Sequence, residues 1–83
     1  MDIARVVSDL VCTRRIDGLK QVSMRVLEGR RGKLTVAIDT IGARPGDWVF
    51  VVSGSAARYA AEDASILTDL TIGGIIDYWD GQI

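Results

Sequence analysis

The chain contains no histidine, one cysteine and one proline in 83 residues. The lack of histidine removes the commonest general base, the commonest metal ligand and the usual partner of a nucleophilic serine or cysteine. A single cysteine cannot form an internal disulfide, which is typical of a protein from a reducing cytoplasm. An enzyme built on this chain would therefore depend on carboxylates, lysine and arginine alone.

Long hydrophobic runs are also absent. The longest is far below the roughly 20 residues that a membrane span needs, and nothing at the N-terminus resembles a signal peptide. We therefore expect a cytoplasmic protein that contacts no membrane. Residues 1–83 are expected to form one domain that buries only roughly 60–65% of its unfolded surface and gains stability by association.

Charge is divided unevenly, although the formal net charge is −1. Residues 1–44 carry nine basic and five acidic side chains, whereas residues 45–83 carry one basic and six acidic side chains. A basic half can indicate nucleic-acid binding. Strands from both halves interleave in a barrel, however, so we expect charges that face solvent or a neighbouring subunit. The densest basic run, Arg30, Arg31 and Lys33, is predicted to be a solvated turn.

The pattern of apolar and polar residues predicts five strands and one short helix. We expect strands at 3–13, 22–26, 34–39, 48–52 and 72–79, with the helix at 56–61 between the fourth and the fifth. Gly73 and Gly74 inside the last strand predict a bulge or a sharp bend. Five strands and one helix in so short a chain are compatible with a small closed barrel.

The same pattern predicts where side chains lie. Alternation indicates a dry face on the second strand and a matching alternation in the third, formed by Val22, Met24 and Val26, and by Leu34, Val36 and Ile38. Ser55 is the expected N-cap of the helix and Tyr59 its one large anchor. Trp79 is expected to form a lid on the core.

The stretch at 37–58 organises the chain as strand, glycine-flanked loop, strand, turn and helix. Pro45 fixes its own φ while Gly42 and Gly46 can take positive φ, so the loop has a defined shape. Residues 48–52 form an unbroken apolar run, which indicates burial on both faces. One small barrel has one interior, so a neighbouring subunit is predicted to cover the second face.

Two possible reactive groups have simpler interpretations. Asp39-Thr40-Ile41-Gly42 is similar to the Asp-Thr-Gly loop of aspartic proteases, but Ile41 stands where that loop has glycine. We expect Asp39 instead to accept hydrogen bonds from loop N–H groups. Cys12 has no histidine to activate it and is predicted to be inert and buried in a strand.

Five short motifs follow one another in a characteristic order. They are Ala4-Arg5-Val6-Val7, Cys12-Thr13-Arg14-Arg15, the G-x-x-x-G loop at 42–46, Gly54-Ser55-Ala56-Ala57-Arg58 and the tail at 69–77. This order and spacing resembles the bacterial microcompartment vertex proteins nearly from end to end, and the tail resembles their carboxysome branch.

The resemblance implies a mainly β, OB-like five-stranded barrel with one short helix that assembles as a pentamer. Such pentamers close the vertices of the carboxysome shell in the cytoplasm and surround a narrow axial pore. It further implies a structural protein without catalysis, cofactor or metal, whose partners are its own copies and hexameric shell proteins. An OB-fold module that binds single-stranded nucleic acid is the alternative, but this function favours exposed aromatics, and the chain has only five.

The resemblance also assigns expected roles to the small-residue motifs. The loop with Gly42, Ala43 and Gly46 is expected near the five-fold axis. The set expected at subunit or shell interfaces is Trp48, Gly54, Ser55, Ala56 and Arg58. Within that set we expect residues 55–58 to face the hexameric neighbour.

Overall fold

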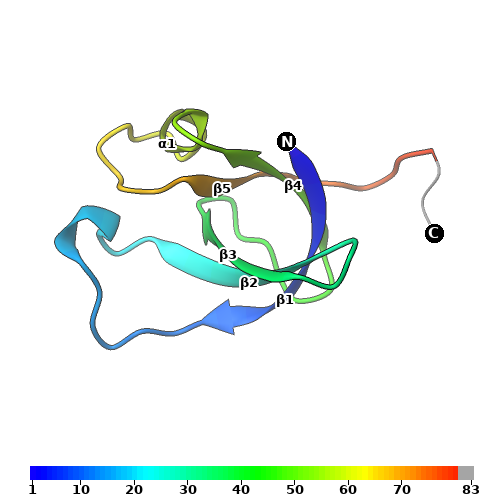
Figure 1. The fold of residues 1–83 in the computed structure, drawn as a ribbon, viewed down its shortest axis with the longest axis horizontal. Helices are drawn as coiled ribbons and strands as arrows, with labels where there is room; N and C mark the ends of the chain where they lie inside the picture. Colours follow the sequence, from blue (N-terminus) through cyan, green and yellow to red (C-terminus); the bar gives the residue numbers. More distant parts are fainter. Residues whose placement is uncertain (81–83) are drawn as a thin grey trace.

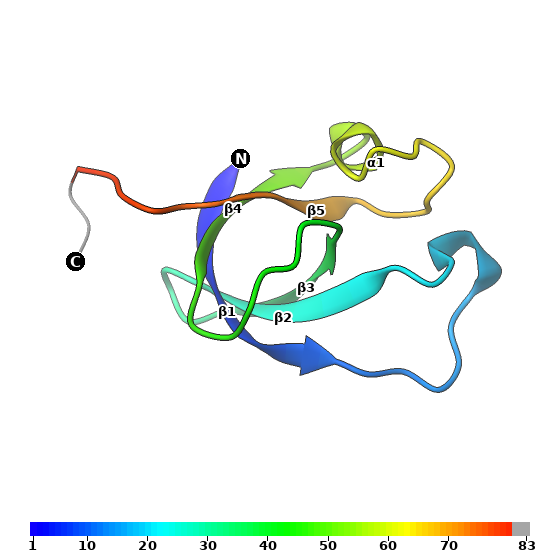
Figure 2. The same ribbon diagram turned by 180° about the vertical axis from the view of Figure 1, so that it is seen from behind.

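Five strands close into a barrel in the order β1-β2-β3-β5-β4 in the computed structural model, which describes residues 1–80 (Figures 1 and 2). The strands are β1 (Asp2–Leu10), β2 (Ser23–Gly29), β3 (Leu34–Asp39), β4 (Trp48–Ser53) and β5 (Leu70–Ile75). A 3₁₀ turn, η1 (Asp17–Leu19), follows β1, and a short helix, α1 (Ala56–Ala60), connects β4 to β5. The predicted barrel with one helix between the fourth and fifth strands is therefore confirmed.

The interior is filled by small and branched side chains from all five strands and from the loop after β3. Its members are Ala4, Val6, Leu27, Ala37, Ala43, Val49, Val51 and Ile72. At one end of the barrel, the buried Thr71 hydroxyl donates a hydrogen bond to the Ala57 carbonyl oxygen at 2.8 Å. This bond ties α1 to β5. The seam between β3 and β5 is parallel and short, with Ile38 opposite Thr71 as its one registered pair.

Two expected strands end earlier than their sequences suggest. β1 stops at Leu10 because its last partner in the barrel is Met24, so Cys12 lies beyond the strand and is exposed. The prediction of a buried Cys12 was wrong. β5 stops at Ile75, and residues 76–80 leave the barrel as an arm that extends away from it (Figure 1).

Part of the apolar row of β2 and β3 lies exposed on the outside of the barrel. Arg25 lies opposite Ala37 and Leu27 opposite Thr35, and these pairs face the interior. Of the row predicted as the dry face, Leu34 and Val36 are therefore exposed and Val26 is half-buried, and here the prediction was wrong. Met24 and Ile38, which pair with each other in the same row, are buried as predicted. The alternation itself is confirmed. The inward position of Arg25 follows from its bonds to the loop after β3.

The outer face of β4 is partly covered by the chain itself. The register shifts by one residue opposite Phe50, which confirms the bulge predicted at Gly73 and Gly74. A side chain at Gly74 would place its Cβ only 2.3 Å from the Phe50 ring, so the glycines make room for that ring. Trp79 packs edge-on against Trp48 with ring centroids 5.5 Å apart. Trp79 thus covers part of the outer face of β4 and is not a lid on the core.

Of the two expectations about α1, the N-cap position of Ser55 is confirmed and the anchor role of Tyr59 was wrong. Ser55 occupies the N-cap position, but its own backbone is helical and its side chain makes no capping hydrogen bond. Tyr59 is 75% exposed, and the small Ala57 is the buried contact of the helix. In a helix of five residues that approaches the barrel end closely, a methyl group fits where a phenol ring does not.

Candidate functional site

The loop after β3 is held by one buried carboxylate. Asp39 Oδ1 accepts hydrogen bonds from the backbone N–H groups of Ile41 and Gly42 at 3.0 Å each, and Oδ2 accepts one from Ala43 at 2.8 Å. The Asp39 side chain is fully buried. The prediction that this aspartate satisfies loop N–H groups is confirmed, and its lone pairs are occupied by structural bonds.

Arg25 completes this network and was missed from the sequence. Its Nε lies 2.9 Å from Asp39 Oδ2 and 2.9 Å from the Ala43 carbonyl oxygen, while its Nη1 lies 3.1 Å from Asp9 Oδ1. A buried carboxylate needs a charged partner, and Arg25 is the polar residue at an inward position of β2. An arginine inside an otherwise apolar alternation was the signal that could have identified it.

The loop at 40–47 therefore has one shape. Gly42 and Gly46 adopt φ of 87° and 96°, which L side chains rarely adopt. The N–H of Gly46 donates to the Val6 carbonyl oxygen at 2.8 Å, so the loop is also docked on β1. Ala43 is 1% exposed and its methyl group belongs to the core. Its side chain anchors the loop, and only Gly42 and Gly46 of the expected axial set are exposed.

The second small-residue motif forms an open surface at the opposite end of β4. Gly54 has φ of 72°, and a Cβ built on it meets no other atom within 4 Å. Within the chain this glycine is therefore required by backbone conformation and not by packing. Ser55 and Ala56 are exposed. The structure does not bring this motif into contact with the loop at 42–46.

Arg58 lies at the edge of a groove of about 400 Å³ between β3, β5 and the loop before β5. The groove is lined mainly by apolar side chains, with Asp69 and Thr68 as its polar members besides Arg58. Among residues 1–80, no ion pair or hydrogen bond engages the Arg58 guanidinium, including the simple pairing with Glu62. Its five donors are thus available to another polypeptide.

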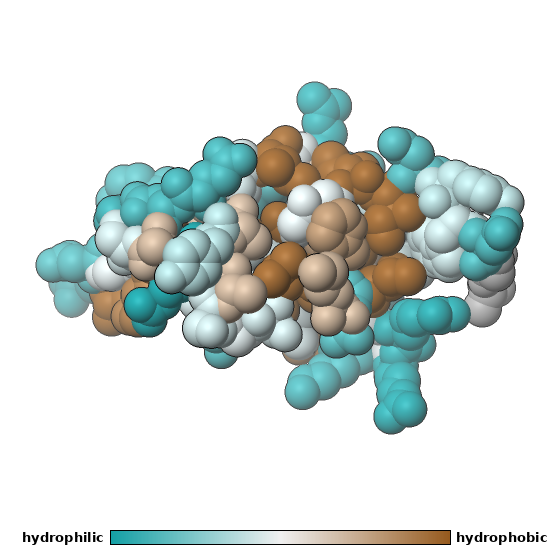
Figure 3. All heavy atoms as spheres, turned by 90° about the horizontal axis from the view of Figure 1, so that it is seen from above, coloured by the Kyte–Doolittle hydropathy of each residue, from teal (hydrophilic) through white to brown (hydrophobic). Residues whose placement is uncertain are grey.

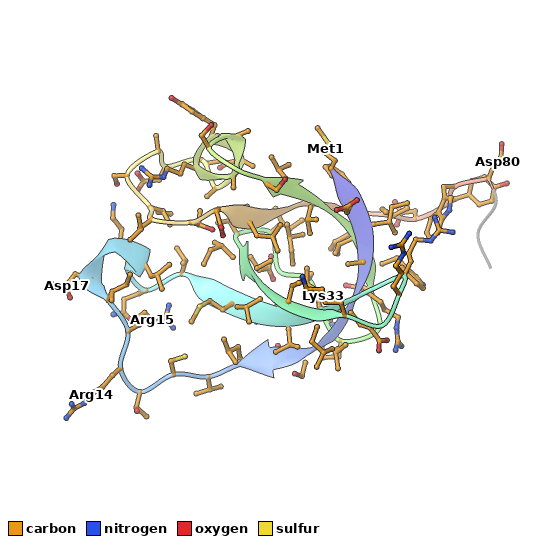
Figure 4. The ribbon with its side chains drawn as sticks, in the orientation of Figure 1. Met1, Arg14, Arg15, Asp17, Lys33 and Asp80 are labelled. Carbon is orange, nitrogen blue, oxygen red and sulfur yellow. The ribbon has the colours of Figure 1, made fainter. Side chains whose placement is uncertain are left out.

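Two loops on the same side are clamped together by charge. Lys20 Nζ lies 3.0 Å from Asp63 Oδ2 and also contacts the Ser65 hydroxyl, while the N–H of Leu67 donates to the Gly18 carbonyl oxygen at 2.7 Å. The hydrogen bond from Ser65, together with Lys20, lowers the pKa of Asp63 from 3.8 to about 2. The preceding loop is fixed from within by Arg15, whose Nη1 donates to the Val22 carbonyl oxygen at 2.6 Å, while Arg14 points away (Figure 4).

A partly exposed apolar surface runs along the outside of β4 and the start of β1. Ile3 lies opposite Phe50 in the β1–β4 register, and Val52 and Met1 continue the row. Figure 3 shows apolar residues gathered on this side of the molecule. The Arg30, Arg31 and Lys33 turn is exposed at the β2–β3 hairpin, which confirms it as a solvated turn in the single chain.

The described part of the chain offers little for other chemistry. No group of three or more metal-ligating side chains lies together in residues 1–80. No helix in that range is long and apolar enough to cross a membrane. What the geometry presents is a rigid loop, a small-residue turn with a free arginine, and uncovered apolar strand faces.

Comparison with known proteins gives these features a context. Residues 1–77 match the protein family described as ethanolamine utilisation protein EutN/carboxysome. The chain is 61% identical over 79 residues to the carboxysome shell vertex protein CsoS4B of Halothiobacillus neapolitanus, covering 95% of this chain and 98% of the relative.

Solved structures of related shell proteins have a similar fold. The structure of CsoS4B from Halothiobacillus neapolitanus superposes with a TM-score of 0.89 at 60% identity, covering 94% of this chain and 100% of that one. The pentameric shell protein of the RMM microcompartment superposes with a TM-score of 0.83 at 29% identity, covering 93% and 91%.

Proposed function

The chain belongs to the family of the ethanolamine utilisation protein EutN and its carboxysome counterparts, and on that premise we propose that it is a structural shell protein. Five copies form a vertex that closes a polyhedral carboxysome shell in the cytoplasm. The match over nearly the whole length to carboxysome vertex proteins carries this proposal. The chain acts through its surfaces, without catalysis or cofactor, and its partners are its own copies and the hexameric shell proteins.

A vertex of this kind has a geometric purpose. Flat hexagonal tiles cannot close a shell, and units with five-fold symmetry introduce the curvature that closure needs. A cyclic ring joins copies head to tail, so each subunit presents two different faces to its neighbours and a third surface to the surrounding tiles. The outer surface of β4, with Trp48 and Phe50 only half-buried, supports one such face.

The rigid loop at 42–46 is suited to the five-fold axis. Subunits that converge on an axis need a backbone that is both compact and fixed, and the Asp39 network supplies this. We place the exposed Gly42 and Gly46 at the rim of a narrow pore, with Ala43 as their buried anchor.

The turn at 54–58 is assigned to the contact with hexameric neighbours. Gly54, Ser55 and Ala56 expose backbone that a neighbour can approach closely, and Arg58 offers donors for carboxylates or carbonyl oxygens. The surface does not favour the binding of single-stranded nucleic acid. The exposed aromatics Tyr59 and Tyr78 lie outside the basic hairpin, so within residues 1–80 no aromatic stacking platform accompanies the basic charge.

Shell closure tests the function. Co-expression with hexameric shell proteins should give closed polyhedra by electron microscopy with this chain and open or tubular assemblies without it. Arg58→Ala should lower the yield of closed shells, and Arg58→Lys nearly as much, because lysine keeps the charge but loses the planar fork. Equal closure with and without the chain would refute the vertex role. If both variants give fully closed shells, Arg58 is not part of the interface, and the vertex role of the chain stands.

A further inference from the structure

Two outer faces of the barrel are apolar and only partly covered within residues 1–80. The first, which we call the β4 face, consists of Ile3, Phe50 and Val52. The second, the β3 face, consists of Val26, Leu34 and Val36, of which Leu34 is 59% and Val36 46% exposed. Surface apolar residues are common singly, but contiguous rows across paired strands mark interaction surfaces.

The two faces point in different directions. In the closed order β1-β2-β3-β5-β4, the first face spans β4 and β1 and the second spans β2 and β3, and both point outward from the one barrel. One face can therefore meet the other only on a different copy of the chain. Since the two faces differ in residues and surroundings, their contact is heterologous, which is the type that closes into rings.

Charge around the two faces is complementary. The β3 face is continuous with the hairpin that carries Arg30, Arg31 and Lys33, and none of the three has an acidic partner in residues 1–80. The arm that follows β5 carries Asp77 and Asp80, which likewise make no ion pair in that range. The arm begins beside β4, because the N–H of Ile76 donates to the Trp48 carbonyl oxygen at 2.7 Å. In Figure 4, Met1 lies at the top of the barrel, Asp80 lies on the arm away from the barrel, and Lys33 lies below both.

We propose that the β4 face and the acidic arm of one copy dock on the β3 face and basic hairpin of the next copy. This inference rests on the proposed ring and names the surfaces that join it. A stable contact covers about 800 Å² per partner, so two joints would cover roughly 1,600 Å². The subunit surface of 5567 Å² can supply both and still leave an edge for other shell proteins.

Paired blocking variants test the joint. Leu34→Glu/Val36→Glu blocks the β3 face, and Ile3→Glu/Val52→Glu blocks the β4 face. Each variant alone should dissociate to folded monomers, with at least a tenfold weaker self-association. Mixed in equal amounts, they retain one intact joint and should form a dimer that cannot grow. Val11→Glu/Ile16→Glu, at exposed apolar positions outside both faces, serves as the control and should keep the parent assembly.

The outcomes separate the joint from the proposed function. If the parent chain forms five-membered rings but either blocked variant does so too, or the mixture of folded variants stays monomeric, the joint is wrong and the vertex role stands. A parent chain that forms no ring defeats the proposed function itself. If a glutamate variant fails to fold by circular dichroism, Leu34→Ser/Val36→Thr and Ile3→Thr/Val52→Thr replace the pair, and unchanged self-association of both would overturn the joint.

Discussion

At the scale of single residues, Asp39 shows how one buried carboxylate can shape a loop that the sequence marks only by its glycines. Three backbone N–H groups and Arg25 converge on it. The motif that suggests protease chemistry is therefore used for architecture. The sequence indicated the N–H groups, but not Arg25, because strand alternation alone does not reveal which face of a strand is interior.

Asp39→Ala should destabilise the fold by about 3–5 kcal/mol, because it leaves Arg25 and three N–H groups without their partner. Asp9→Ala removes the exposed partner of the same arginine and should cost about 0.2–1 kcal/mol. Urea unfolding measures both, and amide hydrogen exchange should accelerate at residues 41–43 in the first variant alone. Similar losses in the two variants would show that the buried network does not control the loop.

The Lys20–Asp63–Ser65 clamp predicts a pH dependence. The pKa of Asp63 is lowered from 3.8 to about 2, so the folded state favours the charged carboxylate. Its contribution is therefore complete above pH 3.8 and is lost as the pH falls towards 2. In a carboxyl-detected NMR titration, Ser65→Ala should raise the pKa of Asp63 towards its ordinary value. An unchanged pKa in that variant would mean that the Ser65 hydrogen bond is not its main cause.

At the scale of elements, the strand count and the glycine bulge were predictable, whereas the orientation of β2 and β3 was not. Alternation fixes which residues share a face, and it correctly predicted that Val26 and Val36 lie on the same face. When the outside of a barrel also packs against other copies, both rows of a strand can carry apolar residues. Alternation then does not show which row faces the interior. The bulge was predictable because adjacent glycines within a strand have few other uses.

Gly74→Ala tests the fit of Phe50 against β5. The new Cβ would lie 2.3 Å from the ring, so the substitution should cost about 1–3 kcal/mol in thermal or urea unfolding. Gly29→Ala, where the nearest atom lies 3.8 Å away, is the matched control and should be tolerated. Phe50→Leu should recover part of the loss in the double variant. A Gly74→Ala protein as stable as its control would contradict the packing described for β4 and β5.

A substitution at Gly54 can distinguish a requirement of backbone conformation from a close contact at an interface. Its φ of 72° strains most side chains but suits asparagine, and a Cβ there meets nothing within the chain. Gly54→Asn should therefore keep the fold, by circular dichroism and melting, while lowering the yield of closed shells. Normal closure with Gly54→Asn would make this position an ordinary turn, and the assigned close contact would be wrong.

At the scale of the whole molecule, the proposed vertex role requires a small barrel that is incomplete as a monomer. Its interior is closed, yet within residues 1–80 two apolar faces are only partly covered, and the basic hairpin and the acidic arm form no ion pair with each other. Such a surface fits a subunit whose stability and purpose come from assembly. The motifs in the sequence could suggest that the chain assembles. The positions of the two apolar faces could be found only once the register of the strands was known.

Native mass measurement of the isolated protein, by mass spectrometry and sedimentation at micromolar concentration, tests the central claim most directly. Five copies of a 9.0 kDa chain predict one closed species of about 45 kDa that does not grow with concentration. Added single-stranded nucleic acid should leave this mass unchanged at low and moderate salt. A monomer or dimer, or a species that binds single strands in a salt-dependent way, would contradict the account.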